Sequence, residues 1–407
     1  MSNSLKALAP EVVKTRRSKS TPQSQPIPGT NMVPNNAGGY TFPLDDWARL
    51  DRFLILGTEG GTYYVAEQTL TQDNAQVVRR CLETDGERVV ERIVQVSEQG
   101  KAYKNDPALF ALAMAATYGT SNVKSLALQA LPKVARIGTH WFHFAAFVNS
   151  MRGWGRGLRN GIASLYTETP ANTLAYQAIK YQQRDGWSHR DLLRLSHPKT
   201  TDPTRNAILH YLTKGWDGIG AEPHPDPVLR LIWAAERAKR VTDEAEMVRL
   251  ITDYSLPREA IPSQWLKSIK VWDALLDGMP MTALIRNLAT MTRVGLLAPL
   301  SNGTRYVVGR LTDQEGLRKA RIHPIGILAA LRTYAQGHGE RSDNTWTPVQ
   351  GVINALDAAF YLTFVNAPVT NKRWLLALDV SGSMASGNVS GVVGLTPRDA
   401  SAALALV

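Results

Sequence analysis

The feature that most constrains the fold of this chain is a succession of amphipathic segments that starts near Tyr64. Each segment runs for about 10 to 18 residues, with apolar residues three or four positions apart and a Gly, Pro or polar cap at its ends. Strand patterns are nearly absent as far as Leu276. Successive helical hairpins of roughly 35 to 45 residues bury their apolar sides on one another in an α-solenoid. The sequence therefore predicts a mostly α-helical solenoid of HEAT-like repeats without a strict consensus.

The solenoid is predicted to span residues 40–370, after a disordered basic tail over residues 1–39. The tail has too little apolar surface to offset the entropy of ordering, and both RNA contact and simple solvation are open roles for it. Towards the other end, Arg305–Leu311 is predicted as a short strand or an extended link. The last helices are predicted over Met279–Leu297, Ile322–Gly339 and Val349–Phe364.

The composition favours a globular protein with a polyanionic partner. Of 407 residues, 44% are apolar and 20% are charged, which allows a large core. The net charge of +11 favours nucleic acid or a membrane surface, because basic residues gain affinity by releasing counterions from phosphates. No run of about 18 apolar residues and no secretion signal are visible, so a soluble cytoplasmic protein is expected. The lone Cys81 is expected to be a small buried apolar residue.

Positive charge is concentrated between Thr139 and His197, where seven Lys or Arg residues accompany three Asp or Glu residues. Lys180 and Arg184 are four positions apart, so they are predicted to project from one face of a helix that Gly186 ends. Exposed cations of this kind suit phosphate oxygens, although most charged helix faces are merely solvated. This stretch alone leaves both interpretations open.

A second cationic helix is predicted to follow directly. Ser188 can cap it, and Arg190 and Arg194 are again four positions apart. His189 at its start and His197 at its end are predicted to offer imidazoles that donate hydrogen bonds near neutral pH. The sequence therefore predicts two cationic helix faces that meet at a tight turn and contact RNA.

Three arginines upstream extend the predicted RNA contact. Arg152, Arg156 and Arg159 recur at helical spacing beside Trp154 and Tyr166. Arginine next to aromatic rings suits phosphate contact combined with base stacking. Large aromatic rings are more often core residues, so we expect the two rings to be buried and only the arginines to be exposed.

Residues 371–407 are predicted to start a different domain. Arg373–Leu378 is a continuous apolar run, as a buried parallel strand should be. Asp379, Ser381 and Ser383 then form a D-x-S-x-S loop at the carboxyl end of that strand, where ligands of open α/β sheets bind. Their carboxylate and hydroxyl oxygens predict a site for a divalent cation, with Mg²⁺ as the expected ion.

Three segments, in this order, carry a resemblance to a known family. They are GWSHRDLLRLSHPKT at 186–200, MPMTALIRNLATMTRVGLL at 279–297 and ARIHPIGILAALRTYAQGHG at 320–339, and LLALDVSGSM follows them. The chain resembles a Ro autoantigen-type protein, in which a TROVE module precedes a von Willebrand factor A domain with a Rossmann-like α/β fold. By this resemblance the DVSGSM loop is the start of the family's metal-ion-dependent adhesion site. A complete A domain has about 180 residues, so the metal site is expected to be incomplete in this sequence.

The resemblance implies a closed ring of helical repeats that binds small noncoding Y RNA on its outer surface. It also implies that single-stranded 3′ ends of misfolded or immature RNA enter the central hole, in RNA quality control or maturation. An exoribonuclease such as polynucleotide phosphorylase is the protein partner that the resemblance suggests. By the same similarity, Lys180, Arg184 and His197 fall on positions implicated in RNA contact.

No enzymatic activity is expected. The sequence shows no nucleophile with a partner base, no H-E-x-x-H or P-loop spacing and no recognisable acid/base pair. The expected function is therefore RNA binding within a small ribonucleoprotein. The alternative is an adaptor that binds proteins through the solenoid and the metal loop, with the basic residues serving only solubility or steering. A third alternative, a helical-repeat nuclease, would require RNA shortening with Mg²⁺.

Overall fold

The computed structural model describes residues 21–22, 24–35, 38–57, 67–216, 220, 222–339, 343–366, 373–389, 392 and 394–406. The basic residues of segment 1–20 lie outside this part of the chain. The described residues are mostly helical, as the sequence predicts. Among them, none of the helices has both the length and the apolar character that a membrane crossing requires.

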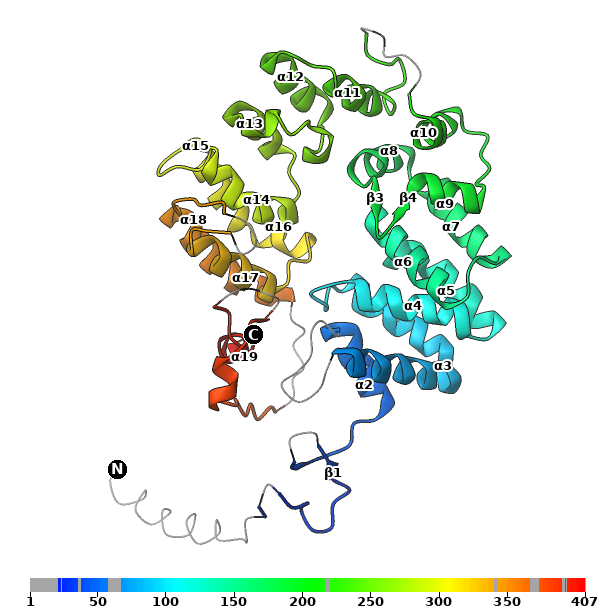
Figure 1. Ribbon diagram of the computed structural model, residues 1–407, viewed down its shortest axis with the longest axis vertical. Helices are drawn as coiled ribbons and strands as arrows, with labels where there is room; N and C mark the ends of the chain where they lie inside the picture. Colours follow the sequence, from blue (N-terminus) through cyan, green and yellow to red (C-terminus); the bar gives the residue numbers. More distant parts are fainter. Residues whose placement is uncertain are drawn as a thin grey trace.

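The helices follow one another around a curve with an open centre (Figure 1). The first half of the curve contains two short hairpins, β1–β2 and β3–β4, which are both antiparallel. Its elements are β1 Val33–Pro34, β2 Tyr40–Thr41, α2 Asp46–Leu56, α3 Glu67–Glu98, α4 Asp106–Tyr118, α5 Ser121–Val134, α6 Gly138–Met151, α7 Arg156–Glu168, α8 Ala171–Lys180, β3 Gln183–Arg184, β4 Trp187–Ser188, α9 His189–Ser196 and α10 Pro203–Lys214.

The second half of the curve leads from α11 back towards the first half. Its elements are α11 Arg230–Ala238, α12 Glu244–Tyr254, η1 Arg258–Ala260, η2 Trp265–Lys267, α13 Ile269–Asp277, α14 Met281–Arg293, α15 Asn302–Leu311, α16 Gln314–Lys319, α17 Pro324–Ala335, α18 Gln350–Leu362 and η3 Thr363–Asn366, followed by η4 Gly382–Ala385 and α19 Pro397–Leu406.

One hydrophobic core runs through the whole array, from Leu50 in α2 to Phe360 in α18. Cys81 belongs to it and is 1% exposed, so the expected role of this residue is confirmed. Close packing also explains why residue 86 is a glycine. Gly86 follows Asp85, whose backbone is non-helical, within α3. A Cβ atom at Gly86 would lie 2.6 Å from a methyl carbon of Val123, so α3 and α5 approach each other closely only because this residue is glycine.

Residues 100–104, between α3 and α4, contact the loop between α16 and α17. The rings of Tyr103 and His323 are 6.0 Å apart and nearly perpendicular. A Cβ atom at Gly100, whose φ is +64°, would lie 2.9 Å from Cβ of Arg321. An early and a late segment of the array are therefore in direct contact.

Two predictions of local structure are wrong. Residues 302–311 form helix α15 rather than a strand or link, because Ser301 caps it by accepting a hydrogen bond from the Thr304 amide. Residues 373–380 form no strand, and Leu375 in this segment is 94% exposed. A parallel strand needs neighbouring strands, and the described residues supply none to this segment.

Candidate nucleic-acid interface

The predicted contact residues come from elements that pack against one another. Helix α7 contacts α9, and α6 contacts both α9 and the β3–β4 hairpin. Figure 1 shows these elements together on one side of the curve. We call the cationic surface the set of side chains that these elements and the end of α8 supply: Arg152, Arg156, Arg159, Lys180, Arg184, Arg190, Arg194 and His197.

The β3–β4 hairpin replaces the predicted helix between Lys180 and Gly186. Helix α8 ends at Lys180, and Arg184 lies in β3, so these two cations do not share a helix face. The turn consists of Asp185 and Gly186, both with positive φ (+53° and +77°). Asp-Gly is the dipeptide that favours this tight hairpin turn, and it overrides the helical spacing. Oδ2 of Asp185 also lies 2.7 Å from Nδ1 of His143, which ties the turn to α6.

Helix α9 begins as the sequence predicts. The Ser188 side chain accepts a hydrogen bond from the Asp191 amide, and the Asp191 carboxylate accepts one from the Ser188 amide, which completes a capping box. Arg190 and Arg194 are both exposed and lie one turn apart. His197 ends the helix in the left-handed conformation, with φ of +48°, and is exposed.

His189 does not belong to the cationic surface, contrary to the sequence prediction. It is 2% exposed, and its Nδ1 lies 2.8 Å from the hydroxyl of Tyr166. The rings of Trp141 and Phe142 pack against it edge to face. Burial lowers the pKa of His189 to about 4, so the ring is uncharged at neutral pH. Helix geometry explains the error, because the N1 position here faces the core.

The upstream arginines come from two elements instead of one helix. Arg152 follows the end of α6, whereas Arg156 and Arg159 lie on α7, and all three are exposed. Tyr166 is fully buried, as expected. Trp154 is half-buried, and its ring centre lies 5.5 Å from that of Trp187, so it joins the α6–α7 link to the hairpin.

Lys180 is half-buried between two tyrosines. Its Nζ donates a hydrogen bond to the hydroxyl of Tyr176 at 3.0 Å and lies 5.7 Å from the ring centre of Tyr181. Burial acts to lower the pKa of Lys180, but the hydrogen bond with Tyr176 and the charge interactions with Tyr181, Tyr176 and Glu259 together outweigh it, so the pKa is raised overall. Lys180 is therefore a fixed positive charge with less freedom than the arginines.

The cationic surface contains few ion pairs. Among the described residues, only Arg184 of this set lies within 4 Å of a carboxylate, at 3.7 Å from Asp185. Several cations elsewhere on the chain are paired, among them those of Arg79–Glu83, Arg80–Asp46, Arg92–Asp51, Arg237–Glu246, Lys239–Glu236, Lys270–Glu244 and Arg318–Glu315. The surface thus keeps positive charge available for an external anion.

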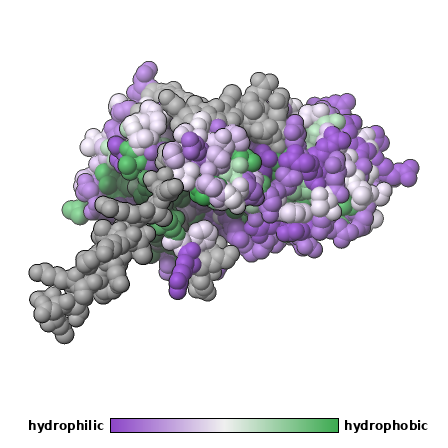
Figure 2. All heavy atoms as spheres, turned by 90° about the horizontal axis from the view of Figure 1, so that it is seen from below, coloured by the Kyte–Doolittle hydropathy of each residue, from purple (hydrophilic) through white to green (hydrophobic). Residues whose placement is uncertain are grey.

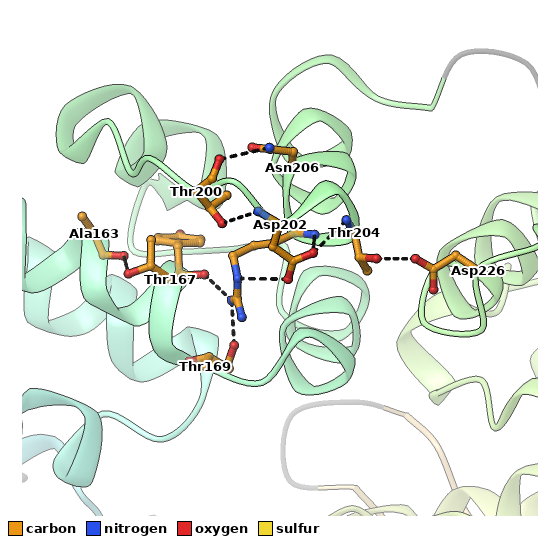
Figure 3. A network of polar contacts seen from close by, with 10 residues as sticks. Ala163, Thr167, Thr169, Thr200, Asp202, Thr204, Asn206 and Asp226 are labelled. Carbon is orange, nitrogen blue, oxygen red and sulfur yellow. Dashed lines mark hydrogen bonds and ion pairs between the residues drawn. The ribbon is translucent and has the colours of Figure 1, made fainter.

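Arg205, whose side chain is 11% exposed, links elements behind this surface. Nη1 of Arg205 donates hydrogen bonds to the carbonyl oxygens of Tyr166 at 2.6 Å and Thr169 at 2.7 Å, which joins α10 to the end of α7. Asp202 caps α10, and its own amide donates to the hydroxyl of Thr200, so the segment after His197 is held as well (Figure 3). The network keeps α7 and α10 in a fixed relation.

The predicted metal loop is exposed and has one carboxylate. Oδ1 of Asp379 accepts a hydrogen bond from the Ser381 amide at 2.9 Å, and this bond lowers the pKa of Asp379. The hydroxyls of Ser381 and Ser383 are 3.0 Å apart. The described residues contain no group of three or more His, Cys, Asp or Glu side chains placed to hold a metal. One carboxylate and two hydroxyls fit a hard cation in chemical type but supply few ligands.

Apolar residues next to the loop are exposed as well. Trp374, Leu375 and Val380 are 68%, 94% and 72% exposed. Figure 2 shows green apolar residues mainly in the left half of that view and a largely hydrophilic right side. The hydrophilic side is that of α3 to α7 in Figure 1.

Sequence reasoning missed a second group of cations around the contact between the two halves. Lys104, Arg286 and Arg321 line one cavity there together with Tyr103 and His323. The only local signal was that Arg286 interrupts the apolar residues of its helix. The other members are too distant in sequence for any spacing rule to connect them.

The helical array is that of a TROVE protein. The family model described as the TROVE domain matches residues 33–372, and the chain belongs to this family. It is 43% identical to RNA-binding protein RO60 of Deinococcus radiodurans over 378 residues, which cover 92% of this chain and 70% of that protein. It is 36% identical to RNA-binding protein RO60 of Caenorhabditis elegans over 448 residues, which cover 92% of this chain and 69% of that protein.

A solved structure agrees with these relatives. The crystal structure of the Deinococcus radiodurans RO (RSR) protein matches with a TM-score of 0.71 and 41% identity, over 89% of this chain and 72% of that one. The relatives that the chain matches are therefore Ro-type proteins.

Proposed function

We propose that this chain binds RNA through the cationic surface. The observation that carries the proposal is that Arg152, Arg156, Arg159, Arg190 and Arg194 are exposed and, among the described residues, have no carboxylate within 4 Å. RNA phosphates supply the charge that the protein itself does not supply, and counterion release favours the contact. The names of the two relatives, which are RNA-binding proteins, support the same conclusion.

The proposed RNA is a small structured noncoding RNA of the Y type. The cations on α7, α9 and the hairpin are distributed over several adjacent elements, which suits a folded RNA with phosphates on more than one strand. Exposed rings are scarce on this surface, because Tyr166 is buried and Trp154 is half-buried. Shape and phosphate contact, rather than base stacking, are therefore the proposed basis of recognition here.

We also propose that the array is a closed ring that admits single-stranded ends of misfolded or immature RNA. The contact of Tyr103 with His323 supports closure. The protein would then act in RNA quality control or maturation as a non-enzymatic cytoplasmic ribonucleoprotein, with an exoribonuclease as the partner that processes the bound RNA. The D-x-S-x-S loop at Asp379 is proposed to bind Mg²⁺ weakly, and we assign it no role in RNA contact.

The second candidate function is a protein-interaction adaptor, and the exposed apolar residues Trp374 and Leu375 favour it. The two functions differ in their response to salt. RNA binding through several phosphates weakens steeply as salt rises, whereas a protein interface around apolar anchors does not.

The experiment is to purify the protein from its native cell with and without the changes Arg190→Ala and Arg194→Ala, and to sequence the RNA that co-purifies. We expect small structured RNAs with the unchanged protein and their loss with the double variant. The exposed Arg249 on α12 offers a matched control, because Arg249→Ala removes an unpaired cation outside the cationic surface. Recovery of only bulk cellular RNA, equal for all three proteins, would reject the proposal.

A further inference from the structure

A cleft lies where α8, α9, α10 and α11 come together, and we call it the α8–α11 cleft. Helix α8 contacts both α10 and α11, α9 contacts α10, and Figure 1 shows these helices as neighbours. The cleft has a volume of about 310 Å³, at the lower end of the range of about 300–1,000 Å³ typical of small-ligand sites. A space of this size accommodates one small molecule. The lining residues with polar or aromatic side chains that bear on its chemistry are Arg190, Tyr211, Trp216, Glu236 and Lys239.

Glu236 on α11 supplies the cleft with a hydrogen-bond acceptor. Its side chain is only 15% exposed. The Tyr211 hydroxyl donates a hydrogen bond to Oε1 of Glu236 at 2.8 Å, and Nζ of Lys239 pairs with the same oxygen. The described residues give Oε2 of Glu236 no hydrogen bond. A mostly buried carboxylate oxygen without a donor favours a ligand that brings N–H groups of its own.

Tyr211 fixes the position of this carboxylate. Burial and the hydrogen bond with Glu236 raise the pKa of Tyr211, so its hydroxyl keeps the proton that it donates. Because Tyr211 comes from α10 and Glu236 from α11, the bond also holds the two walls of the cleft together.

Trp216 offers the cleft a flat aromatic surface. The indole is half-buried, and its two ring neighbours are Tyr211 at 6.2 Å and His224 at 5.6 Å between ring centres. Both neighbours are steeply inclined to it, by 70° and 78°. Among the described residues, therefore, no ring is stacked in parallel on Trp216. A planar heterocycle can stack there, as bases do on aromatic side chains in enzymes that bind a single base.

Arg190 supplies the cleft with a cation for a phosphate group. It is exposed at the start of α9, and among the described residues it has no carboxylate within 4 Å. A guanidinium group matches the geometry of phosphate oxygens. Arg190 also belongs to the cationic surface, so a phosphate bound in the cleft occupies a cation that RNA uses as well.

We propose that the α8–α11 cleft binds a free guanine mononucleotide, which competes with RNA for Arg190. The base stacks on Trp216, the Glu236 carboxylate accepts hydrogen bonds from N1 and the exocyclic amino group of guanine, and the phosphate contacts Arg190. Adenine is disfavoured, because its N1 is an acceptor and faces the carboxylate without a proton between them. The competition rests on the proposed function, RNA binding, whereas the nucleotide site itself does not.

The first test measures four ligands by calorimetry on the unchanged protein. They are guanosine, inosine and adenosine monophosphate and inorganic phosphate. Inosine monophosphate lacks the exocyclic amino group and should bind roughly tenfold more weakly than guanosine monophosphate, the size expected for one hydrogen bond to a charged group. Adenosine monophosphate should bind more weakly still, and inorganic phosphate should bind most weakly. Absence of binding by guanosine monophosphate, or equal affinity for all four ligands, would overturn the inference.

The second test compares three variants, Glu236→Gln, Trp216→Leu and the control Arg249→Ala, whose folding is checked by circular dichroism and melting temperature. Glu236→Gln keeps an acceptor oxygen for Tyr211 but removes the charge, and it should abolish the preference for guanosine over adenosine monophosphate. Trp216→Leu should weaken all three nucleotides by roughly tenfold and leave inorganic phosphate unchanged. Arg249→Ala should bind like the unchanged protein. A purely structural role of Glu236 would lower the melting temperature without changing the preference, and that result would overturn the inference.

The third test measures competition with a fully paired RNA hairpin. Guanosine monophosphate should weaken hairpin binding several-fold in the unchanged protein but not in Glu236→Gln, and adenosine monophosphate should have little effect. Guanosine monophosphate that binds without weakening the hairpin would overturn the competition. If the hairpin does not bind at all while guanosine monophosphate binds in calorimetry, the proposed function fails and the nucleotide site stands.

A last comparison separates a free nucleotide from a guanine within RNA. Hairpins with a single unpaired guanine or a single unpaired adenine should bind with equal affinity. Tighter binding of the guanine hairpin, lost in Glu236→Gln and seen without binding of guanosine monophosphate, would overturn the free nucleotide as the ligand.

Discussion

The hydroxyl of Tyr166 on α7 lies 2.8 Å from Nδ1 of His189 at the start of α9. This buried contact joins the two helices that carry four arginines of the cationic surface. Trp141 packs edge to face against both rings. A histidine that the sequence suggests as an RNA ligand is therefore a core residue that sets the spacing of two helices of the cationic surface.

The burial of His189 predicts a pH-dependent stability. Its pKa is about 4 in the folded chain and about 6.5 in the unfolded chain, so the unfolded state takes up a proton first as the pH falls. The contribution of neutral His189 to the free energy of unfolding is fully present above pH 6.5 and is lost as the pH falls towards 4. Between pH 7 and pH 5 the free energy of unfolding should fall by about 2 kcal/mol from His189 alone. Urea denaturation at several pH values measures it.

His140 acts in the same direction, because burial lowers its pKa to about 3. The variant His189→Gln, which cannot titrate, should therefore keep part of the pH dependence but show a smaller decrease than the unchanged chain. An unfolding free energy that is constant or rises between pH 7 and pH 5 would show that His189 is not buried in its neutral form.

Removing the capping box of α9 should lower the free energy of unfolding. Ser188→Ala removes the acceptor for the Asp191 amide and should reduce the unfolding free energy by about 1 kcal/mol. Ser188→Thr keeps the hydroxyl and serves as the matched control. Chemical denaturation of both variants is the measurement, and equal losses in the two would contradict the cap.

The single carboxylate of the D-x-S-x-S loop predicts weak metal binding. Calorimetry on these 407 residues should show no Mg²⁺ site tighter than roughly millimolar, the weak end for oxygen ligands. Asp379→Ala should leave RNA affinity within about twofold, because the cationic surface needs no cation. A micromolar site that disappears in Asp379→Ala would show that the ligand set is larger than Asp379, Ser381 and Ser383.

Local patterns in the sequence were sufficient for most of the helical array. Ser188 and Asp191 are three positions apart, so the start of α9 can be read directly from them. The Asp185–Gly186 turn could also have been predicted, but the spacing of Lys180 and Arg184 favoured a helix there. The helical spacing and the Asp-Gly dipeptide favour different structures here. The chain forms the turn, in which both Asp185 and Gly186 adopt positive φ.

Contacts between distant segments could not be predicted. The burial of His189 depends on Tyr166 and Trp141 from other helices, and a spacing rule sees only neighbours on one helix. The cavity lined by Lys104, Arg286 and Arg321 likewise requires segments distant in sequence to meet across the array. The apolar run at Arg373–Leu378 reads as a buried strand, but burial depends on neighbouring strands, which local spacing does not reveal.

The most direct test of RNA binding by the cationic surface is the salt dependence of affinity for a Y-type RNA. The logarithm of the binding constant, plotted against the logarithm of the salt concentration, gives the number of phosphate contacts. The variant Arg190→Ala/Arg194→Ala should bind more weakly, and its slope should be smaller by about 0.7 to 0.9 for each lost contact. Arg249→Ala should match the unchanged protein in both. A double variant with the affinity and slope of the unchanged protein would contradict the assignment of RNA binding to this surface.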